Sequence, residues 1–341
     1  MMQFVNAREL DQSLFEAALE LQQRLDRARD PELPATPADE LRATFDDDAS
    51  ENARHERIVA FDEGQAVALG HLELTHDSAN KRLAIVEITS VRHDISKVVL
   101  GELLRMARAD GRTSVIAWGD CTAEADAFWT GLGAELRSTE QESDLDMASV
   151  DAELMRRWID AAPDDINLVH WAGRCPEEHI DALVVTANAM NDAPTDSLEI
   201  EDMSFDAAIL RADFDARDAC GIDYLGLLAV GTDGSAAGAT EVFVNRFRPA
   251  FAWQWNTVVL PAYRGRGIGR WIKAAMWQRL RAEVPEATTL RTGNAESNAA
   301  MLAINTEMGF QPSHLMGCWQ ADLTTLESGL SRGGGRGGIT A

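Results

Sequence analysis

The stretch that decides the fold is LPAYRGRGIGRW, residues 260–271, in which glycine occupies three alternate positions between arginines. The apolar run NTVVL (256–260) before it is typical of a strand, and RWIKAAMWQRLRAE (270–283) after it predicts a helix. In a glycine loop between a strand and a helix, backbone N–H groups converge on an anion, because no side chain holds the anion away. The stretch therefore predicts a site for a phosphate-bearing ligand.

Two common nucleotide loops do not fit this stretch. A Walker A loop needs Gly-Lys followed by serine or threonine, and no such sequence follows. A Rossmann fingerprint starting at Gly265 needs glycine or alanine at position 270, where the chain has Arg270. The remaining interpretation is an anion cradle formed by the loop and the start of the helix.

The charge distribution supports an anionic ligand at this place. The whole chain carries a net charge of −25, yet residues 242–282 contain no aspartate or glutamate and hold eight lysines and arginines. A ligand with a diphosphate group accounts for this basic interval, since arginine binds phosphate oxygens well.

Length and composition exclude several classes of protein. The 341 residues favour two domains, and 45% hydrophobic residues are enough for real cores. The sequence has no run of 18 apolar residues that could span a membrane and no secretory signal. The four cysteines are far apart, and neither an H-E-x-x-H motif nor another paired ligand spacing indicates a metal site. We therefore expect a cytoplasmic protein, monomer or homodimer, with no bound metal and no membrane partner, and the acidic charge argues against a nucleic-acid partner.

The order of predicted elements repeats along the chain. Residues 1–175 and residues 176–328 each alternate amphipathic helices with short apolar strands, which predicts two α/β domains (α+β with a mixed sheet), one duplicated from the other. The glycine-rich residues 329–341 are expected to be a disordered tail.

Two motifs in the second half resemble the GNAT acetyltransferase superfamily. VVLPAYRGRGIGRWIKAAMWQRL looks like its acetyl-coenzyme A motif, Arg/Gln-x-x-Gly-x-Gly/Ala, with Arg264, Gly267 and Gly269 at the three fixed positions. NAESNAAMLAINTEMGF resembles the strand and helix that follow in this family, with Asn298 at the recurrent asparagine. The two-domain layout is similar to that of tandem GNAT proteins, a group to which mycothiol synthase belongs.

The resemblance implies how acetyl-coenzyme A would be held. The strand that precedes the loop would splay from its neighbour, so that backbone groups of Val258, Val259 and Leu260 pair with the pantetheine arm. Asn298 would contact the coenzyme further along. The loop residues that would wrap the pyrophosphate are Arg264, Gly265, Arg266, Gly267, Ile268 and Gly269.

The first half departs from this pattern. Where the loop glycines should stand, it has Asp94, Ile95 and Ser96, and an acidic residue there opposes phosphate. We therefore expect residues 1–175 to form a degenerate GNAT-like domain without coenzyme binding, and one active site per chain.

Acetyl transfer to an amine needs a base for the ammonium proton and a group that protonates the thiolate. Glu241 is the candidate base, because a carboxylate on a central strand has a raised pKa, although an exposed strand glutamate fits equally well. Asn305 stands where many relatives have a catalytic tyrosine; it could hydrogen-bond the sulfur or be a satisfied core amide. Gln254 and Asn256 alternate on one strand and are candidates for lining the acceptor site, with Trp253 and Trp255 on the other side.

The sequence thus indicates an acetyl-CoA-dependent N-acetyltransferase acting on a primary amine of a small molecule, such as a cationic antibiotic or an amino-sugar metabolite. One alternative is acetylation of a cysteinyl pseudodisaccharide, as in mycothiol synthesis. An alternative of another class is an acetyl-CoA sensor or pseudoenzyme, which asparagine at position 305 allows.

Overall fold

The computed structural model describes residues 2–47 and 53–333, and the chain forms two compact units. Unit 1 comprises Met1–Thr139, Thr195–Glu201 and Leu315–Ala341. Unit 2 comprises Glu140–Pro194 and Asp202–His314. Each unit is an α/β structure built on a mixed sheet.

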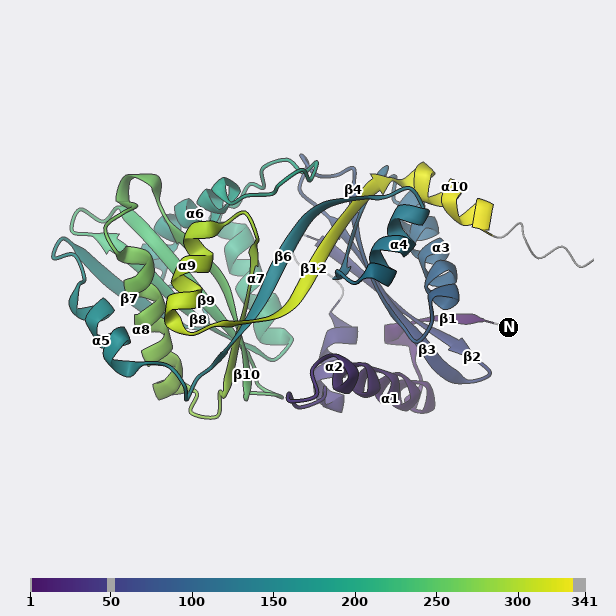
Figure 1. Cartoon of the computed structure of the whole chain (residues 1–341), viewed down its shortest axis with the longest axis horizontal. Helices are drawn as coiled ribbons and strands as arrows, with labels where there is room; N and C mark the ends of the chain where they lie inside the picture. The colour runs from purple at the N-terminus through teal and green to yellow at the C-terminus, as the bar shows by residue number, and fades with distance from the viewer. Residues whose placement is uncertain (1, 48–52, 334–341) are drawn as a thin grey trace, which may run out of the picture. The chain divides into compact units, whose positions relative to one another are not determined.

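Unit 1 has the strand order β1-β2-β3-β4-β5-β12, with every pair antiparallel except β4 and β5. Figure 1 labels β1, β2, β3, β4 and β12 of this sheet. Its strands are β1 (Gln3–Asn6), β2 (Ala53–Asp62), β3 (Gln65–Thr75), β4 (Leu83–Ser90), β5 (Ser114–Asp120) and most of β12 (Gln311–Asp322). Its helices are α1 (Gln12–Arg29), α2 (Ala38–Asp46), α3 (His93–Ala109), α4 (Ala123–Gly131) and α10 (Leu323–Gly333), with the 3₁₀ turn η1 (Ala7–Glu9).

Unit 2 has the strand order β6-β11-β10-β9-β8-β7, and here only β10 and β11 pair in parallel. Its strands are most of β6 (Glu135–Asp146), β7 (Ile166–Ala172), β8 (Ile222–Gly231), β9 (Ala236–Asn245), β10 (Phe251–Val259) and β11 (Thr289–Ala295). Its helices are α5 (Ala152–Asp160), α6 (Ile180–Asn188), α7 (Ala207–Ala219), α8 (Ile268–Glu283) and α9 (Ala299–Met308), with the 3₁₀ turns η2 (Glu177–His179), η3 (Ala189–Asp192) and η4 (Pro261–Tyr263).

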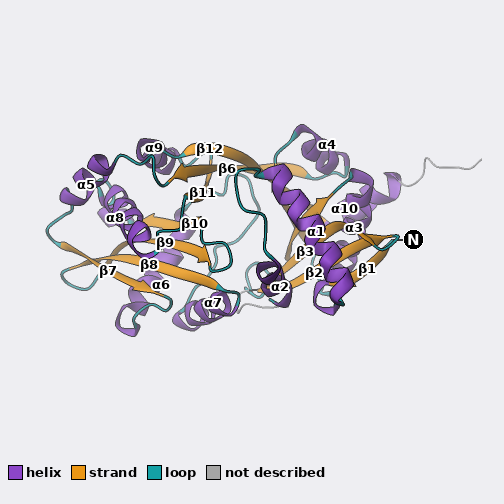
Figure 2. Ribbon diagram, turned by 90° about the horizontal axis from the view of Figure 1, so that it is seen from below, coloured by secondary structure: helices purple, strands orange, loops and turns teal. Residues whose placement is uncertain are grey.

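Helices cover both faces of the sheet in unit 2, with the strands between them (Figure 2). On one face, Leu183 of α6 and Phe214 of α7 pack with Tyr224 and Leu228 of β8. On the other face, α8 buries Met276 and Leu280 among residues of β9 and β11. The near-continuous apolar sequence of β8 follows from this burial on both faces.

The compact units do not follow the boundary at residue 175 that the sequence suggested. Strand β6, with α5 and β7 after it, comes from the first half of the chain but belongs largely to unit 2, where β6 pairs with β11. Strand β12 comes from the second half and pairs with β5 of unit 1 along residues 316–322. Strand pairing is not local, so the order of elements alone could not reveal this exchange.

The predicted disordered tail, residues 329–341, starts too early, because helix α10 continues to Gly333. Residues 329–333 belong to α10, because Leu323 and Leu326 in the first turns of that helix are buried in the core of unit 1 and anchor it there. The remaining residues of the expected tail, 334–341, lie outside the described residues.

Candidate functional site

The glycine loop leaves the backbone N–H groups at the start of α8 unobstructed by side chains. Gly265 and Gly267 have φ values of 78° and 80°, in the left-handed region that favours glycine, and a Cβ atom on either would meet nothing within 4 Å. Gly267 is the N-cap residue of α8 and supplies no side chain to its first N–H groups. Within the described residues, the N–H groups from Gly265 to Arg270 have no acceptor, and the helical ladder starts with Trp271 donating to the Gly267 carbonyl at 3.1 Å.

The third glycine of the loop has a packing role. A Cβ on Gly269 would lie 3.3 Å from Cδ1 of Ile304 on α9 and 3.7 Å from Cγ2 of Val259 on β10. Glycine at this position therefore lets the first turn of α8 approach both neighbours closely.

Strands β10 and β11 separate beside this loop. Their parallel pairing runs from Phe251–Thr289 to Gln254–Thr292 and stops there, although β10 continues to Val259. The expected splay is thus present. Leu260 donates its N–H to Ala237 on the β9 side at 2.9 Å, so alternation turns the N–H and C=O of Val259 toward the opened side.

The arginines of the loop have carboxylate partners, which the sequence did not indicate. Arg264 donates from Nη2 to Asp192 at 3.0 Å and from Nε to the Val259 carbonyl at 3.1 Å. Arg266 pairs with Asp165, and Arg270 pairs with Glu307 at 2.8 Å. Positive charge at the loop is therefore compensated by acidic residues distant in sequence, and the unpaired N–H groups are the stronger indication of an anion site.

Glu241 lies on β9 and is held by two side chains. The hydroxyl of Tyr224 on β8 donates to its Oε1 at 2.6 Å, and Asn256 of β10 is a second hydrogen-bond partner. Burial raises the pKa of Glu241 above its usual value, while these hydrogen bonds and nearby Arg217 counteract the rise. Burial and the nearby Glu241 also raise the pKa of Tyr224 well above its usual value, so its hydroxyl stays protonated and donating.

A β-bulge in β10 corrects one prediction. The register of β10 on β9 shifts between Gln254 and Thr257, so two residues of β10, Trp255 and Asn256, lie opposite Glu241. Gln254 is buried and donates from Nε2 to Oγ1 of Thr240, which lies on the opposite face of β9 from Glu241. Gln254 and Asn256 therefore do not line one side of the strand together, because the bulge interrupts the alternation.

An aromatic surface lies on the Glu241 face of the sheet, beside the bulge. The side chain of Trp255 is 48% exposed, and its ring lies 5.8 Å from that of Phe243, two residues after Glu241 on β9. The guanidinium of Arg217 on α7 covers the Phe243 ring at 4.0 Å and pairs with Asp213. The sequence placed Trp255 on the side of the strand opposite Gln254 and Asn256; it does lie opposite Gln254, whereas the bulge turns Asn256 to Glu241. The sequence assigned no role to Tyr224 or Arg217, because their proximity to Glu241 depends on strand register and on the packing of α7.

The two asparagines of the α9 region have local structural roles. Asn298 is the N-cap residue of α9, and its side chain accepts a hydrogen bond from the N–H of Met301 at 3.3 Å. Asn305 is buried, donates from Nδ2 to Oδ1 of Asn294 at 2.7 Å, and leaves its own Oδ1 without a hydrogen-bond partner. Reversing both amides would keep this bond and give Asn305 an unpaired N–H instead.

Neither a cluster of metal ligands nor a helix able to span a membrane occurs in the described part of the chain. No three His, Cys, Asp or Glu side chains gather there as a metal site would require. None of the helices in that part is both long and apolar enough to cross a bilayer.

Comparison with known proteins identifies this arrangement. Residues 190–310, which carry the loop, the splayed strand and Glu241, match the model of the acetyltransferase (GNAT) family. The tandem GNAT protein from the clavulanic acid biosynthesis pathway superposes with a TM-score of 0.79 at 22% identity, covering 95% of this chain and 99% of that one. Residues 190–310 thus match a GNAT domain, and the chain as a whole has the fold of tandem GNAT proteins.

Other solved structures have a similar fold. A GCN5-related N-acetyltransferase from Sphaerobacter thermophilus gives a TM-score of 0.65 at 13% identity over 94% of this chain and 96% of that one. A GCN5-related glucosamine N-acetyltransferase region of a fungal multi-domain β-N-acetylglucosaminidase gives 0.63 at 12% identity, over 94% of this chain and 38% of that one. In sequence, the chain matches none of the curated proteins. The GNAT assignment supports acetyl transfer as the class of reaction.

Proposed function

We propose that unit 2 binds acetyl-coenzyme A and transfers its acetyl group to a primary amine of a small molecule. The observation that carries this proposal is the set of unpaired N–H groups from Gly265 to Arg270, next to the separated edge of β10. A helix N-terminus with open space in front of it suits a diphosphate, because both its N–H groups and its dipole favour negative charge.

The residues of this site fit the coenzyme along its length. Backbone N–H groups of Gly265, Gly267 and Ile268 would hold the diphosphate, and the Val259 N–H on the opened edge of β10 would hold an amide of the pantetheine arm. The Val259 carbonyl is already engaged by Arg264, so the arm would have to displace that arginine to use both groups. Val258, Leu260 and Asn298 are expected to shape this path rather than to supply side-chain contacts.

The bound coenzyme supplies an acetyl thioester, and the residues of the chain prepare the amine. We assign Glu241 as the base that removes a proton from the ammonium group, directly or through one water, so that the nitrogen lone pair becomes available. Tyr224 and Asn256 hold its carboxylate in place. The raised pKa of Glu241 makes it a better proton acceptor than an ordinary glutamate.

The surroundings of Glu241 favour a cationic acceptor. The exposed face of Trp255 can bind an ammonium group by cation–π attraction, and the Phe243 face is already covered by Arg217. An acceptor amine seated between Trp255 and Glu241 would lie close to its base. This geometry favours a protonated primary amine, and we propose the amine of a cationic antibiotic or of an amino-sugar metabolite as the acceptor.

A coenzyme sensor is the second candidate function, and Asn305 favours it. An amide has no proton to give to a thiolate, so the leaving thiolate would take its proton from water, and a reversed amide could only hydrogen-bond the sulfur. A sensor would bind the coenzyme without releasing thiol in the presence of any amine.

Release of free thiol from acetyl-coenzyme A, with a panel of primary amines, tests the proposal. With a responsive amine, Glu241→Gln is expected to lower kcat by about 100-fold or more, as loss of a general base does, with coenzyme affinity nearly unchanged. The same charge removal at an exposed site, Glu286→Gln, should leave both unchanged. An unaltered kcat in Glu241→Gln would refute the base assignment. Tight coenzyme binding without thiol release, whichever amine of the panel is added, would favour the sensor.

We further propose that unit 1 does not bind this coenzyme. Helix α3 starts after Arg92 with no glycine before it, and Asp94 in its first turn pairs with Arg92. A carboxylate at a helix N-terminus competes with a bound phosphate for the same N–H groups.

A further inference from the structure

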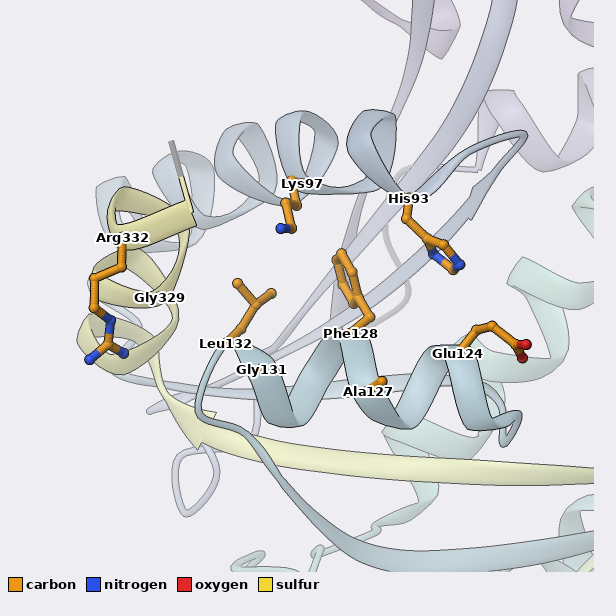
Figure 3. Close-up of a pocket in the computed structure, with 9 residues that line it drawn as sticks. All are labelled: His93, Lys97, Glu124, Ala127, Phe128, Gly131, Leu132, Gly329 and Arg332. Carbon is orange, nitrogen blue, oxygen red and sulfur yellow. The ribbon is translucent and has the colours of Figure 1, made fainter. Parts of the chain in front are cut away.

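Unit 1 contains a cavity that acetyl transfer in unit 2 does not explain. It has a volume of about 590 Å³ and lies between α3 and α4, closed at one end by α10 (Figure 3). This volume is in the range of pockets that hold metabolite-sized ligands.

The cavity belongs to a part of unit 1 that retains the layout of the coenzyme site in unit 2. In unit 1, β4, α3, β5 and α4 follow one another as β10, α8, β11 and α9 do in unit 2. The parallel pairing of β4 and β5 also stops early, at Val86–Ala117, although β4 continues to Ser90. The early end of the parallel pairing has thus been kept, whereas the glycine loop for a diphosphate has not.

The walls of the cavity combine an apolar floor with positive charge. Phe128 and Leu132 project from α4 toward α3, and Lys97 projects from α3 toward them (Figure 3). Arg332 of α10 lies at one end of the cavity, and His93 and Glu124 lie at the other (Figure 3).

The two fixed cations of the cavity are available to a ligand. Neither Lys97 nor Arg332 has a carboxylate partner among the described residues, whereas neighbouring Arg105 and Arg108 are paired with Glu102 and Glu327. An anionic group that meets Lys97 would gain a charge-assisted hydrogen bond without displacing an existing ion pair, and Arg332 at the end of the cavity would add a longer-range attraction.

We propose that this cavity binds a small organic carboxylate with an aromatic or branched apolar body. The apolar body would pack on Phe128 and Leu132, and the carboxylate would meet Lys97. A single carboxylate suits the site better than a diphosphate, because Asp94 occupies the first turn of α3.

Binding of 4-phenylbutyrate to the full chain, followed by calorimetry, tests the proposal against the uncharged analogue 4-phenylbutan-1-ol. We expect the acid to bind, and the alcohol to bind at least about tenfold more weakly, because it cannot form the charged contacts. Lys97→Met should weaken binding of the acid by about tenfold. Removal of another exposed lysine of unit 1, Lys81→Met, should have no effect.

A second variant blocks the cavity without relying on charge. A Cβ on Gly131 would meet nothing within 4 Å, and this glycine does not have a positive φ, so Gly131→Leu should fold and fill the cavity. This variant should abolish binding of 4-phenylbutyrate and leave coenzyme A binding to unit 2 unchanged. Failure of the acid to bind, or binding that survives both Lys97→Met and Gly131→Leu, would overturn the proposal, whatever the outcome for the coenzyme.

Discussion

At the scale of single residues, Lys273 on α8 is unusual because it is a lysine buried in the protein interior. It is only 1% exposed, its Nζ lies 5.2 Å from the centre of the Phe310 ring, and no carboxylate pairs with it among the described residues. Burial lowers the pKa of Lys273 to about 7. The folded protein therefore holds this amine partly neutral at neutral pH.

The lowered pKa makes the free energy of unfolding depend on pH in a definite direction. Between about pH 7 and the ordinary lysine value of 10.5, the unfolded chain binds more protons at this site than the folded chain, so stability rises with pH over that window. Lys273→Met removes this dependence. The variant should exceed the wild type in stability most at pH 7, and this advantage should shrink by roughly 2 to 4 kcal/mol toward pH 10.

Chemical denaturation of both proteins at several pH values measures this difference. Lys81→Met, at an exposed lysine, should show a constant difference from the wild type across the same pH range. A constant difference for Lys273→Met as well would mean that Lys273 titrates normally in the folded state.

At the scale of elements, ligand binding at the junction of β10, the glycine loop and α8 depends more on the backbone conformation than on side chains. Gly267 combines a φ of 80° with open space where a side chain would stand. A methyl group there would both strain the backbone and project toward the ligand position in front of the helix N-terminus.

Gly267→Ala is therefore expected to weaken coenzyme A binding by about tenfold or more, with a loss of stability of about 1 kcal/mol. Gly111→Ala is a matched control, because Gly111 also has a φ of 80° and nothing within 4 Å of its Cβ position, but lies after α3 in unit 1. Calorimetric titration and thermal unfolding should show equal destabilisation in the two variants and lost affinity in Gly267→Ala alone. Equal affinity in both variants would remove the loop from the coenzyme site.

The elements also show how far the sequence could lead. The strand, loop and helix around residues 260–271 were predictable, because glycine spacing and apolar periodicity are local signals. The bulge at Trp255 and Asn256 was not, because a register shift depends on the partner strand. The same holds for the pairing of Arg264 with Asp192 and of Tyr224 with Glu241, which join segments distant in sequence.

At the scale of the whole molecule, the two halves of the chain exchange strands. Unit 1 needs β12, whose residues 316–322 pair with β5 and whose Trp319 is buried in the core of that unit. Unit 2 needs β6, whose residues 140–146 pair with β11 and whose Leu145 is buried in its core. Neither half of the sequence therefore contains all the strands of one unit.

This exchange predicts that residues 1–175 will not fold alone. Without β12 and α10, the edge of β5 is unpaired, and the core loses Trp319, Leu323 and Leu326. The loss of each of these side chains lowers the free energy of unfolding, which is itself small, by roughly 2 to 5 kcal/mol. Adding residues 311–333 to residues 1–139 through a flexible glycine-serine linker should restore a cooperative thermal transition, followed by circular dichroism and tryptophan fluorescence. Cooperative unfolding of residues 1–175 without that addition would show that the strand from the second half is dispensable to unit 1.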